Sequence, residues 1–340
     1  MAALGPISGT YALAKVDSGL VAQLGKWSIN PKTEASEVAH SATAQAMDRV
    51  PGNLDWEGNF MAYGDSPLVW PGQTFVFSGS MDAPGATYYG TIGYTGRAIC
   101  DEITIKLDVE GGKEIGYDAK FSSAVRSGLA ATDYLQPSLS LNLPKDNATN
   151  ALYSAIGCGA SLAICPSTAI APSWFAPSYP TAPTLCDFTG YNPVTNTPAP
   201  TNGFLGDVRT MDINIKAANK AYNSSGTGGY TGRLTGPLDI TVGISCYVDK
   251  ALGFGALPPQ RTVLGARLYT RTDLSRYWEF AWLIVNQLSN IEADRHSGNI
   301  IGTTLNMGFK ATGISAAGLG WIKAPPSDPT ASGCTQRWPS

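Results

Sequence analysis

Closely spaced carboxylates are the residues of this chain best suited to chemistry. Asp55 and Glu57 are separated by one residue, and Asp101 is followed directly by Glu102. Paired carboxylates can divide the acid and base roles of glycoside hydrolysis. Residues two apart on a β-strand share one face, however, and charged residues in such positions more often form a solvated face. The pairs therefore give only weak support for a glycosidase.

Cysteine and histidine offer no better constellation. The chain has six cysteines, no C-x-x-C pair, and only His40 and His296 as imidazoles. A structural zinc site needs four clustered nitrogen or sulfur ligands, and no G-x-S-x-G nucleophile elbow is present. We therefore expect no metal and no cofactor. Cys158, Cys165 and Cys186 lie close enough in sequence to cross-link, but reduced cysteines are the expectation for a cytoplasmic chain.

Two glycine-rich stretches come near to phosphate-binding loops without meeting the pattern. Residues 19–26 (GLVAQLGK) place five residues between the glycines instead of four, and Trp27 follows where Ser or Thr is needed. Gly226-Thr-Gly-Gly lacks the G-x-G-x-x-G spacing. Trp27, Trp56 and Tyr89 could stack on a sugar, although aromatic residues on alternating strands usually belong to a core. The residues predict a protein that is not an enzyme.

Composition favours β structure. Only 14% of the 340 residues are charged, whereas 38 are Gly and 23 are Pro, and few charges with many turn formers and aromatics are typical of strands joined by turns. The net charge of −3 provides no basic field for gripping nucleic acid. No apolar run approaches the roughly 20 residues of a membrane span, and the first residues lack a secretory pattern. We expect no membrane partner.

The sequence matches itself at two offsets, 184 and then 188 residues. The order and spacing of the identities, over about 100 residues in each copy, predict a tandem duplication. The identities are Ile29/Ile213, Asn30/Asn214, Lys32/Lys216, Arg49/Arg233, Gly52/Gly236, Leu54/Leu238 and Asp55/Asp239 at the first offset, and Pro71/Pro259, Thr74/Thr262, Tyr89/Tyr277 and Phe121/Phe309 at the second.

Each copy predicts antiparallel strands. Apolar and polar residues alternate over Leu54–Ala62 and Ile103–Val109, the period of a strand with one wet face. The alternation fades over Asn286–His296, where a helix is equally compatible. We therefore predict a mainly β chain with two tandem antiparallel sandwich or barrel domains, long loops and few short helices. The core shared by the copies is predicted to contain Trp27, Trp56, Phe60, Tyr89, Phe121, Ile240, Tyr277 and Phe309.

Two polar segments at equivalent points of the copies predict long exposed loops, Thr33–Asp48 and Ala217–Gly232. Long loops in compact domains are usually functional or disordered, and we expect these two to carry contacts between assembled subunits. The residues proposed for that role are Thr33, Glu34, Glu37, Asp48, Lys220, Tyr222 and Tyr230. The chain thus divides into a first domain over 1–126, a connecting segment over 127–186 that is poor in charge, and a second domain over 187–340.

Several motifs in this order resemble the tail tube proteins of long-tailed bacteriophages. The resemblance begins with K-W-S-I at Lys26–Ile29 and R-V-P-G-N-L-D-W-E-G-N-F-M-A-Y at Arg49–Tyr63. It continues with P-G-Q-T-F-V-F at Pro71–Phe77 and A-T-Y-Y-G-T-I at Ala86–Ile92, and ends in a strand running into Lys120-Phe121. The match covers most of residues 25–125 and, more faintly, 209–313. The second copy departs from it, with Ile240 in place of Trp56 and Trp278 in place of Gly90.

The resemblance implies a structural virion protein. Subunits of that family are β-sandwiches that join edge to edge into rings, and the rings stack into a tube that conducts double-stranded DNA. A duplicated chain resembles members that build a pseudo-six-fold ring from three chains. The implied partners are further copies of the chain, other tail proteins and passing DNA that is not held tightly. The implied location is the virion tail, after assembly in the host cytoplasm.

Two alternatives stay open at this point. One is another structural role in a virion, as a baseplate, distal-tail or capsid decoration protein. The other is a β-sandwich module that binds carbohydrate, for which Trp27, Trp56 and Tyr89 would supply stacking surfaces.

Overall fold

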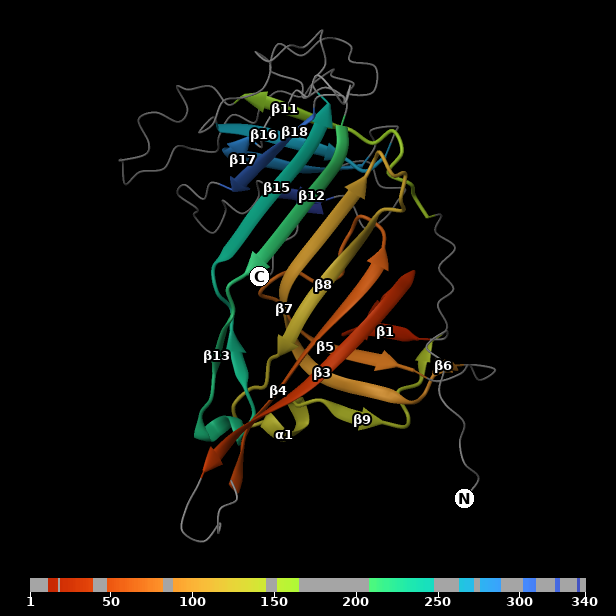
Figure 1. Ribbon diagram of the computed structural model, residues 1–340. Helices are drawn as coiled ribbons and strands as arrows, with labels where there is room; N and C mark the ends of the chain where they lie inside the picture. The colour runs from red at the N-terminus through yellow and green to blue at the C-terminus, as the bar shows by residue number, and fades with distance from the viewer. Residues whose placement is uncertain are drawn as a thin grey trace.

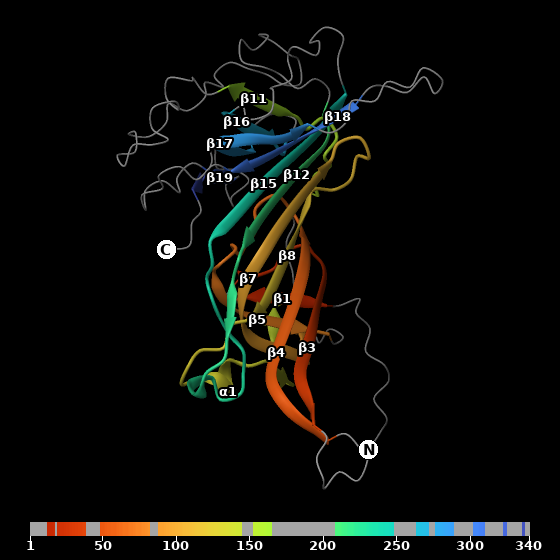
Figure 2. The same ribbon diagram turned by 60° about the vertical axis from the view of Figure 1, so that its left-hand side comes forward.

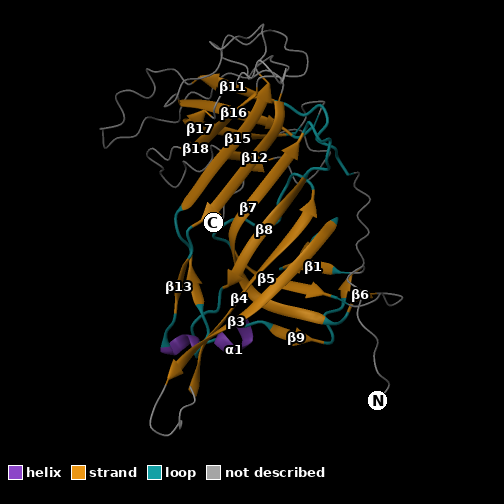
Figure 3. Cartoon of the chain, in the orientation of Figure 1, coloured by secondary structure: helices purple, strands orange, loops and turns teal. Residues whose placement is uncertain are grey.

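The computed structural model is mainly β (Figure 3). It describes residues 12–17, 19–38, 48–81, 88–144, 152–164, 208–247, 263–271, 276–288, 302–309, 322–324 and 335–336. Within these ranges the helical structure is one short α-helix, α1 (Ala130–Asp133), and one 3-10 turn, η4 (Ser225–Thr227). No helix in the described ranges is long and apolar enough to cross a membrane. The prediction of a mainly β, antiparallel chain is confirmed.

The first part of the chain supplies ten strands. In spatial order β1, β5, β7, β8, β4 and β3 are hydrogen-bonded neighbours, and β9 pairs with the start of β7. We call these seven the first strand set. The bounds are β1 (Leu13–Val16), β2 (Gly19–Leu20), β3 (Leu24–Val38), β4 (Asp48–Tyr63), β5 (Thr74–Ser80), β6 (Tyr88–Gly90), β7 (Gly93–Asp108), β8 (Gly116–Ser123), β9 (Gln136–Ser138) and β10 (Leu143–Pro144).

The later strands repeat this order. In spatial order β11, β16, β17, β18, β15 and β12 are hydrogen-bonded neighbours, and β19 pairs with the start of β17. These seven form the second strand set (Figure 2). The bounds are β11 (Ala160–Ile164), β12 (Val208–Ala217), β13 (Lys220–Tyr222), β14 (Gly232–Leu234), β15 (Leu238–Tyr247), β16 (Val263–Tyr269), β17 (Tyr277–Leu288), β18 (Gly302–Phe309), β19 (Ile322–Ala324) and β20 (Thr335–Gln336).

The leading hairpins of the two sets share one register. Lys26 lies opposite Met61, and 184 positions later in both strands Thr210 lies opposite Ser245. Both hairpins also carry a bulge at the same place, after Leu24 and after Val208. A bulge bends its strand and re-aims the side chains beside it. The offset of 184 read from the sequence therefore coincides with the strand pairing.

Further along the chain, the strand pairing does not support two of the aligned residue pairs, Phe121/Phe309 and Tyr89/Tyr277. Gly58 lies opposite Phe121, and its counterpart Val242 lies opposite Met307, so Met307 rather than Phe309 stands at the position of Phe121. A slip of two residues keeps the same face of a strand, so the sequence pattern does not reveal it. Tyr89 lies in β6, which pairs with β10, whereas Tyr277 opens β17 and pairs with β16.

A hydrophobic core runs through both sets. Trp56, Phe60 and Phe121 are at most 1% exposed, and Ile240 is 2% exposed. Phe121 is the centre of an aromatic group, with ring centroids 4.8 to 6.1 Å from those of its neighbours Phe77, Phe75, Trp56 and Phe60. These four predicted core positions are buried.

The other four predicted core positions differ. Trp27 is half-buried, its ring edge-on to Phe77 and its Nε1 donating to the Ser80 carbonyl at 3.2 Å. Tyr277 is also half-buried, under the guanidinium of Arg267. The side chains of Tyr89 and Phe309 lie outside the described residues, although their backbones belong to β6 and β18.

The predicted loops and connecting segment contain regular structure. Thr33–Val38 continues β3 and Asp48 begins β4, so both ends of the first predicted loop belong to a pair of antiparallel strands, and residues 39–47 lie outside the described residues. The second contains β13, η4 and β14. Backbone pairing needs no apolar face, which explains why the alternation missed these strands. The segment 127–186 contributes α1 and three strands. β9 pairs with β7, β10 pairs with β6, and β11 pairs with β16.

Candidate assembly interface

The two strand sets join edge to edge. Residues Glu102–Asp108 of β7 pair antiparallel with Thr210–Lys216 of β12, a junction that we call the seam. It makes one continuous sheet of 16 strands, in which β15, β12, β7 and β8 run side by side (Figure 1). An edge strand normally exposes unpaired backbone groups to other chains. At the seam the backbone groups of the β7 edge and those of the β12 edge pair with each other.

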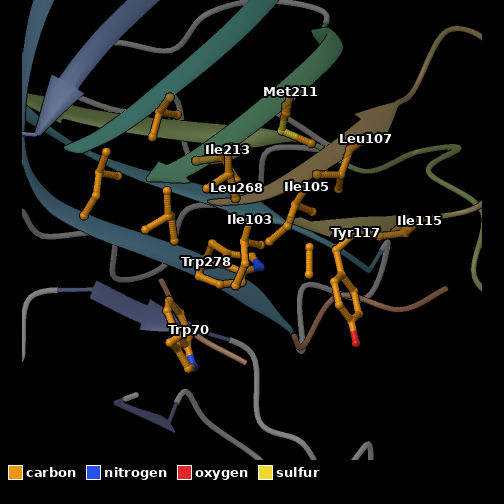
Figure 4. Close-up of a cluster of buried hydrophobic side chains, with 14 of the residues drawn as sticks. Trp70, Ile103, Ile105, Leu107, Ile115, Tyr117, Met211, Ile213, Leu268 and Trp278 are labelled. Atoms are coloured by element: carbon orange, nitrogen blue, oxygen red, sulfur yellow. The ribbon is translucent and has the colours of Figure 1, made fainter. Parts of the chain in front are cut away.

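Side-chain alternation gives the seam a dry face. Ile103, Ile105 and Leu107 of β7 lie opposite Ile215, Ile213 and Met211 of β12 in the pairing. All six are at most 1% exposed. All six belong to one buried cluster, and Figure 4 shows five of them, Ile103, Ile105, Leu107, Met211 and Ile213, with Leu268 and Trp278 of the second set. Burying such a side chain contributes roughly 1.5–3 kcal/mol, so the apolar face of the seam is a major source of stability.

The opposite face of the seam is polar. Glu102 accepts hydrogen bonds from Lys120 Nζ and from Asn214 Nδ2, both at 2.8 Å, and the second of these crosses the seam. Burial alone would raise the pKa of Glu102, but these two donors outweigh it and the pKa lies below its ordinary value. Arg209 and Tyr247 of the second set also bond Glu110 of the first.

A half-buried ion pair lies beyond the end of the seam. Arg233 in β14 donates to both carboxylate oxygens of Asp55 in β4, at 2.8 and 2.6 Å, and to the Ser123 carbonyl at 3.0 Å. Ser123 Oγ donates to the same carboxylate at 2.8 Å. Burial would raise the pKa of Asp55, yet the bonds from Arg233 and Ser123 hold it below the ordinary value. Bidentate arginine–carboxylate pairs fix orientation as well as charge.

Backbone contacts surround that ion pair. The amide of Leu54 donates to the Gly229 carbonyl at 2.8 Å, and the amide of Thr231 donates back to Leu54 at 2.9 Å. The rings of Tyr134 and Tyr230 lie 4.8 Å apart. The second predicted loop therefore packs on the β3–β4 hairpin of the first strand set, and contacts within the same chain hold it there.

A second ionic cluster joins the sets at the other end. Asp65, 3% exposed, follows β4 and accepts from Arg276 at 2.6 and 3.0 Å and from Thr270 Oγ1 at 2.5 Å. Arg271 Nη1 lies 3.3 Å from the same carboxylate, and Trp278 Nε1 donates to the Asp65 carbonyl. A buried charge is tolerated only when it is paired and hydrogen-bonded. This cluster ties the loop after β4 to the turn between β16 and β17.

The outer edge of β3 differs from that of its counterpart β12. Among the described residues β3 pairs with β4 alone, whereas β12 pairs with both β15 and β7. The solvent-facing residues of β3 include Lys26, Pro31 and Lys32. Lysine and proline are typical of edge strands that must not pair indiscriminately. β3 is thus a long edge strand whose lysines and proline disfavour indiscriminate pairing with other strands.

The residues proposed for subunit contacts fall in the two hairpin arms. Thr33, Glu37 and Lys220 are exposed, Tyr222 is half-buried, and Tyr230 packs on the first set as described above. Glu37 pairs with Arg49 at 3.0 Å. The backbones of Glu34 and Asp48 belong to β3 and β4, but their side chains lie outside the described residues. Figures 1 and 2 place β13 and the outer arm of β3–β4 toward the same end of the molecule.

The carboxylates considered for catalysis have structural partners. Asp55 bonds Arg233, Glu57 pairs with Lys32 at 2.5 Å, and Glu102 bonds Lys120. Asp101 accepts from Ser122 and Asn219. In the part of the chain that the structure describes, no group of three or more His, Cys, Asp or Glu side chains could hold a metal ion.

Three cysteines lie within the described residues, and all three are free and buried: Cys100, Cys158 and Cys246. Burial raises the pKa of both Cys158 and Cys246 to about 11. Thiols with such values stay protonated and unreactive at neutral pH. These three cysteines are packed in the hydrophobic core. Cys165, Cys186 and Cys334 lie outside the described residues.

Sequence reasoning missed the residues that join the sets. Arg233 and Asp55 were visible as members of repeated pairs, but nothing in the repeat indicates that they touch each other. Asp65 and Arg276 are 211 residues apart and carry no spacing signal. Neither family models nor curated protein sequences gave a match to this chain.

Proposed function

We propose that the chain is a structural subunit that assembles with copies of itself through sheet edges into rings, and that the rings stack into a tube. The observation that supports this most is the seam. Two strand sets of equal order are already joined edge to edge within one chain, while no described strand pairs with the edge of β3 equivalent to the one used by β12. A chain that repeats this junction with its neighbours would close into a ring.

The proposal includes a tandem duplication. The shared strand order, the common hairpin register and the matching bulges support two copies of one ancestral domain. The copies run from about β1 to β9 and from β11 to β19. These bounds differ from the predicted 1–126 and 187–340, because β9 and β11 lie in the segment between them. Three such chains would present six like domains around a ring.

Tail tube proteins of long-tailed bacteriophages are the model for this role, through the sequence motifs described above. A conduit for double-stranded DNA must not retain it, and a chain with net charge −3 and 14% charged residues has little to neutralise phosphates. On this proposal the protein is a virion component assembled in the host cytoplasm. Its partners are copies of itself and other tail proteins, and its role is structural rather than catalytic.

The hairpin arms are proposed to mediate stacking of rings. The outer arm of β3–β4 projects beyond the core with exposed polar residues, and the β13–β14 arm lies toward the same end (Figure 1). The second arm is partly committed to the first strand set through Tyr230, so we assign the larger share of stacking to the β3–β4 arm. Removal of residues 34–45 should leave rings that no longer stack.

Electron microscopy of the purified full-length chain in negative stain tests the proposal. Rings and hollow tubes of uniform diameter are the expected result. Rings that never stack would instead favour another virion role, such as a baseplate or decoration protein. A chain that stays monomeric at high concentration, and that binds oligosaccharides on an array, would overturn the proposal in favour of a carbohydrate-binding module.

A further inference from the structure

Arg233 and Asp55, which form an ion pair, each have a counterpart of the same residue type 184 positions away, Arg49 and Asp239. Arg233 occupies the position in β14 that Arg49 occupies in β4, opposite Ala221 and Glu37 respectively. Asp55 likewise lies opposite Lys32, as its counterpart Asp239 lies opposite Lys216. Both residue types are the same in the two hairpins, and within the described residues Arg233 pairs with Asp55 whereas Arg49 pairs with Glu37.

The contact within the chain specifies where the duplicate members would meet. Arg233 lies in β14, between β12 and β15 of the second strand set along the chain, and Asp55 lies in β4 of the first set, which contributes β7 to the seam. At a seam of the same geometry between two chains, the arginine would come from β4 of one chain and the aspartate from β15 of the next. We propose that Arg49 of one chain pairs with Asp239 of a second copy, at a junction in which the edge of β3 meets the edge of β17.

The surroundings of both residues fit this pairing. The Arg49 side chain is 73% exposed and its pair with Glu37 lies on the surface, where such pairs contribute little. Asp239 is exposed as well. The Arg233 and Asp55 side chains, by comparison, are 15% and 26% exposed in their contact. Burial of Arg49 and Asp239 against each other would complete the equivalence of the two junctions.

The strand edges can be compared over the described residues, which on β17 include only Gln287 and Leu288 of the stretch that corresponds to Glu102–Asp108. Lys26–Lys32 of β3 corresponds to Thr210–Lys216 of β12, the stretch that pairs with β7. On the other side, Glu102 follows a bulge in β7 opposite β8, and Gln287 follows the same bulge in β17 opposite β18. Asn214 donates to Glu102 across the seam, so Asn30 would face Gln287 of the neighbouring chain. Two amides can satisfy each other in that position.

The inference rests on the proposed self-assembly and names the partner surface for it. Charge reversal tests it: Arg49→Asp, Asp239→Arg, and both changes in one chain. Each single change places like charges at every junction between chains and should raise the concentration needed for assembly about tenfold or more, whereas the double change restores opposite charges and should return it close to wild type. Sedimentation velocity over a concentration series measures this.

Asp118→Arg is the matched control, a charge reversal at an exposed residue of β8 that lies outside both junctions. It should assemble as wild type does, and circular dichroism should show all variants folded. If wild type assembles and the single variants assemble equally well, or the double variant fails to recover, this pairing is wrong while the proposed function stands. If wild type never assembles, both the pairing and the proposed function fail.

Discussion

The two leading hairpins have the same pairing but different surroundings. β3–β4 and β12–β15 agree in register and in the position of a bulge. β12 is nevertheless an interior strand, where Ile213 and Ile215 are at most 1% exposed. In β3 the counterpart of Ile213, Ile29, is half-buried, and the counterpart of Ile215 is the exposed Pro31.

The difference shows that the hairpin does not decide its own role in the sheet. Whether its outer edge is interior or free depends on the strand beside it, which is β7 for β12. A proline is tolerated on an edge strand but removes a ladder hydrogen bond from an interior one. Pro31 is therefore compatible with the edge position of β3, and Ile215 with the interior position of β12.

Exchanging these two residues should give the largest effect. Ile215→Pro removes an amide from a strand paired on both sides and a fully buried side chain, so we expect a loss of about 4 kcal/mol in the free energy of unfolding. Pro31→Ile should stay within about 0.5 kcal/mol. Urea unfolding followed by tryptophan fluorescence measures both. Equal losses for the two variants would refute the distinction between interior and edge.

The buried cluster at Asp65 should come next. Asp65→Asn leaves Arg276 and Arg271 without their counter-charge and should cost about 3 kcal/mol of stability. Asp118→Asn, at an exposed position, is the control and should change stability by less than about 0.5 kcal/mol. A loss below about 1 kcal/mol, the scale of a surface ion pair, would mean that the cluster does not hold the two sets together.

The repeated aspartates should respond unequally. Asp55→Asn weakens a bidentate, half-buried contact and should cost about 2 kcal/mol. Asp239→Asn should leave the stability of the single chain within about 0.5 kcal/mol, because its carboxylate is exposed. Thermal unfolding of dilute protein, below the concentration at which it assembles, compares them. A larger loss at Asp239 would contradict the assignment of the intrachain pair.

The pH dependence of that difference has a definite sign. The pKa of Asp55 is lowered on folding, so its contribution to stability is fully present above the ordinary carboxyl value of 3.8 and is lost as the pH falls through the lower folded value. The stability gap between wild type and Asp55→Asn should therefore be constant from neutral pH to about pH 4.5 and shrink below the ordinary value. Urea unfolding at a series of pH values checks this. A gap that widens in acid would show that the carboxylate is not stabilised by folding.

Local patterns made the strands and the hairpin offset predictable from the sequence. Alternation located Leu54–Ala62 and Ile103–Val109 within β4 and β7, because side-chain burial in a sheet has a period of two residues. Past the hairpins the alignment slipped by two residues at Phe121, whose position opposite Gly58 is matched by Met307 opposite Val242. The pairing of β16 with β17 also carries an irregularity, after the pair Leu264–Leu283, that the pairing of β5 with β7 lacks.

The junction itself could not be predicted from local patterns. Which edge pairs with which depends on contacts between residues far apart in sequence, such as Ile105 with Ile213 or Asp65 with Arg276. β11 was equally hidden, because five residues within a segment poor in charge carry little strand signal. Such contacts depend on the three-dimensional arrangement of the strands, which local sequence patterns do not specify.

A cryo-electron microscopy reconstruction of the assembled protein tests the central claim most directly. The account predicts rings of three chains with six like domains, in which seams of β7 with β12 inside a chain alternate with junctions of β3 and β17 between chains. Rings joined through any other surface, with the β3 edge still facing solvent, would contradict it.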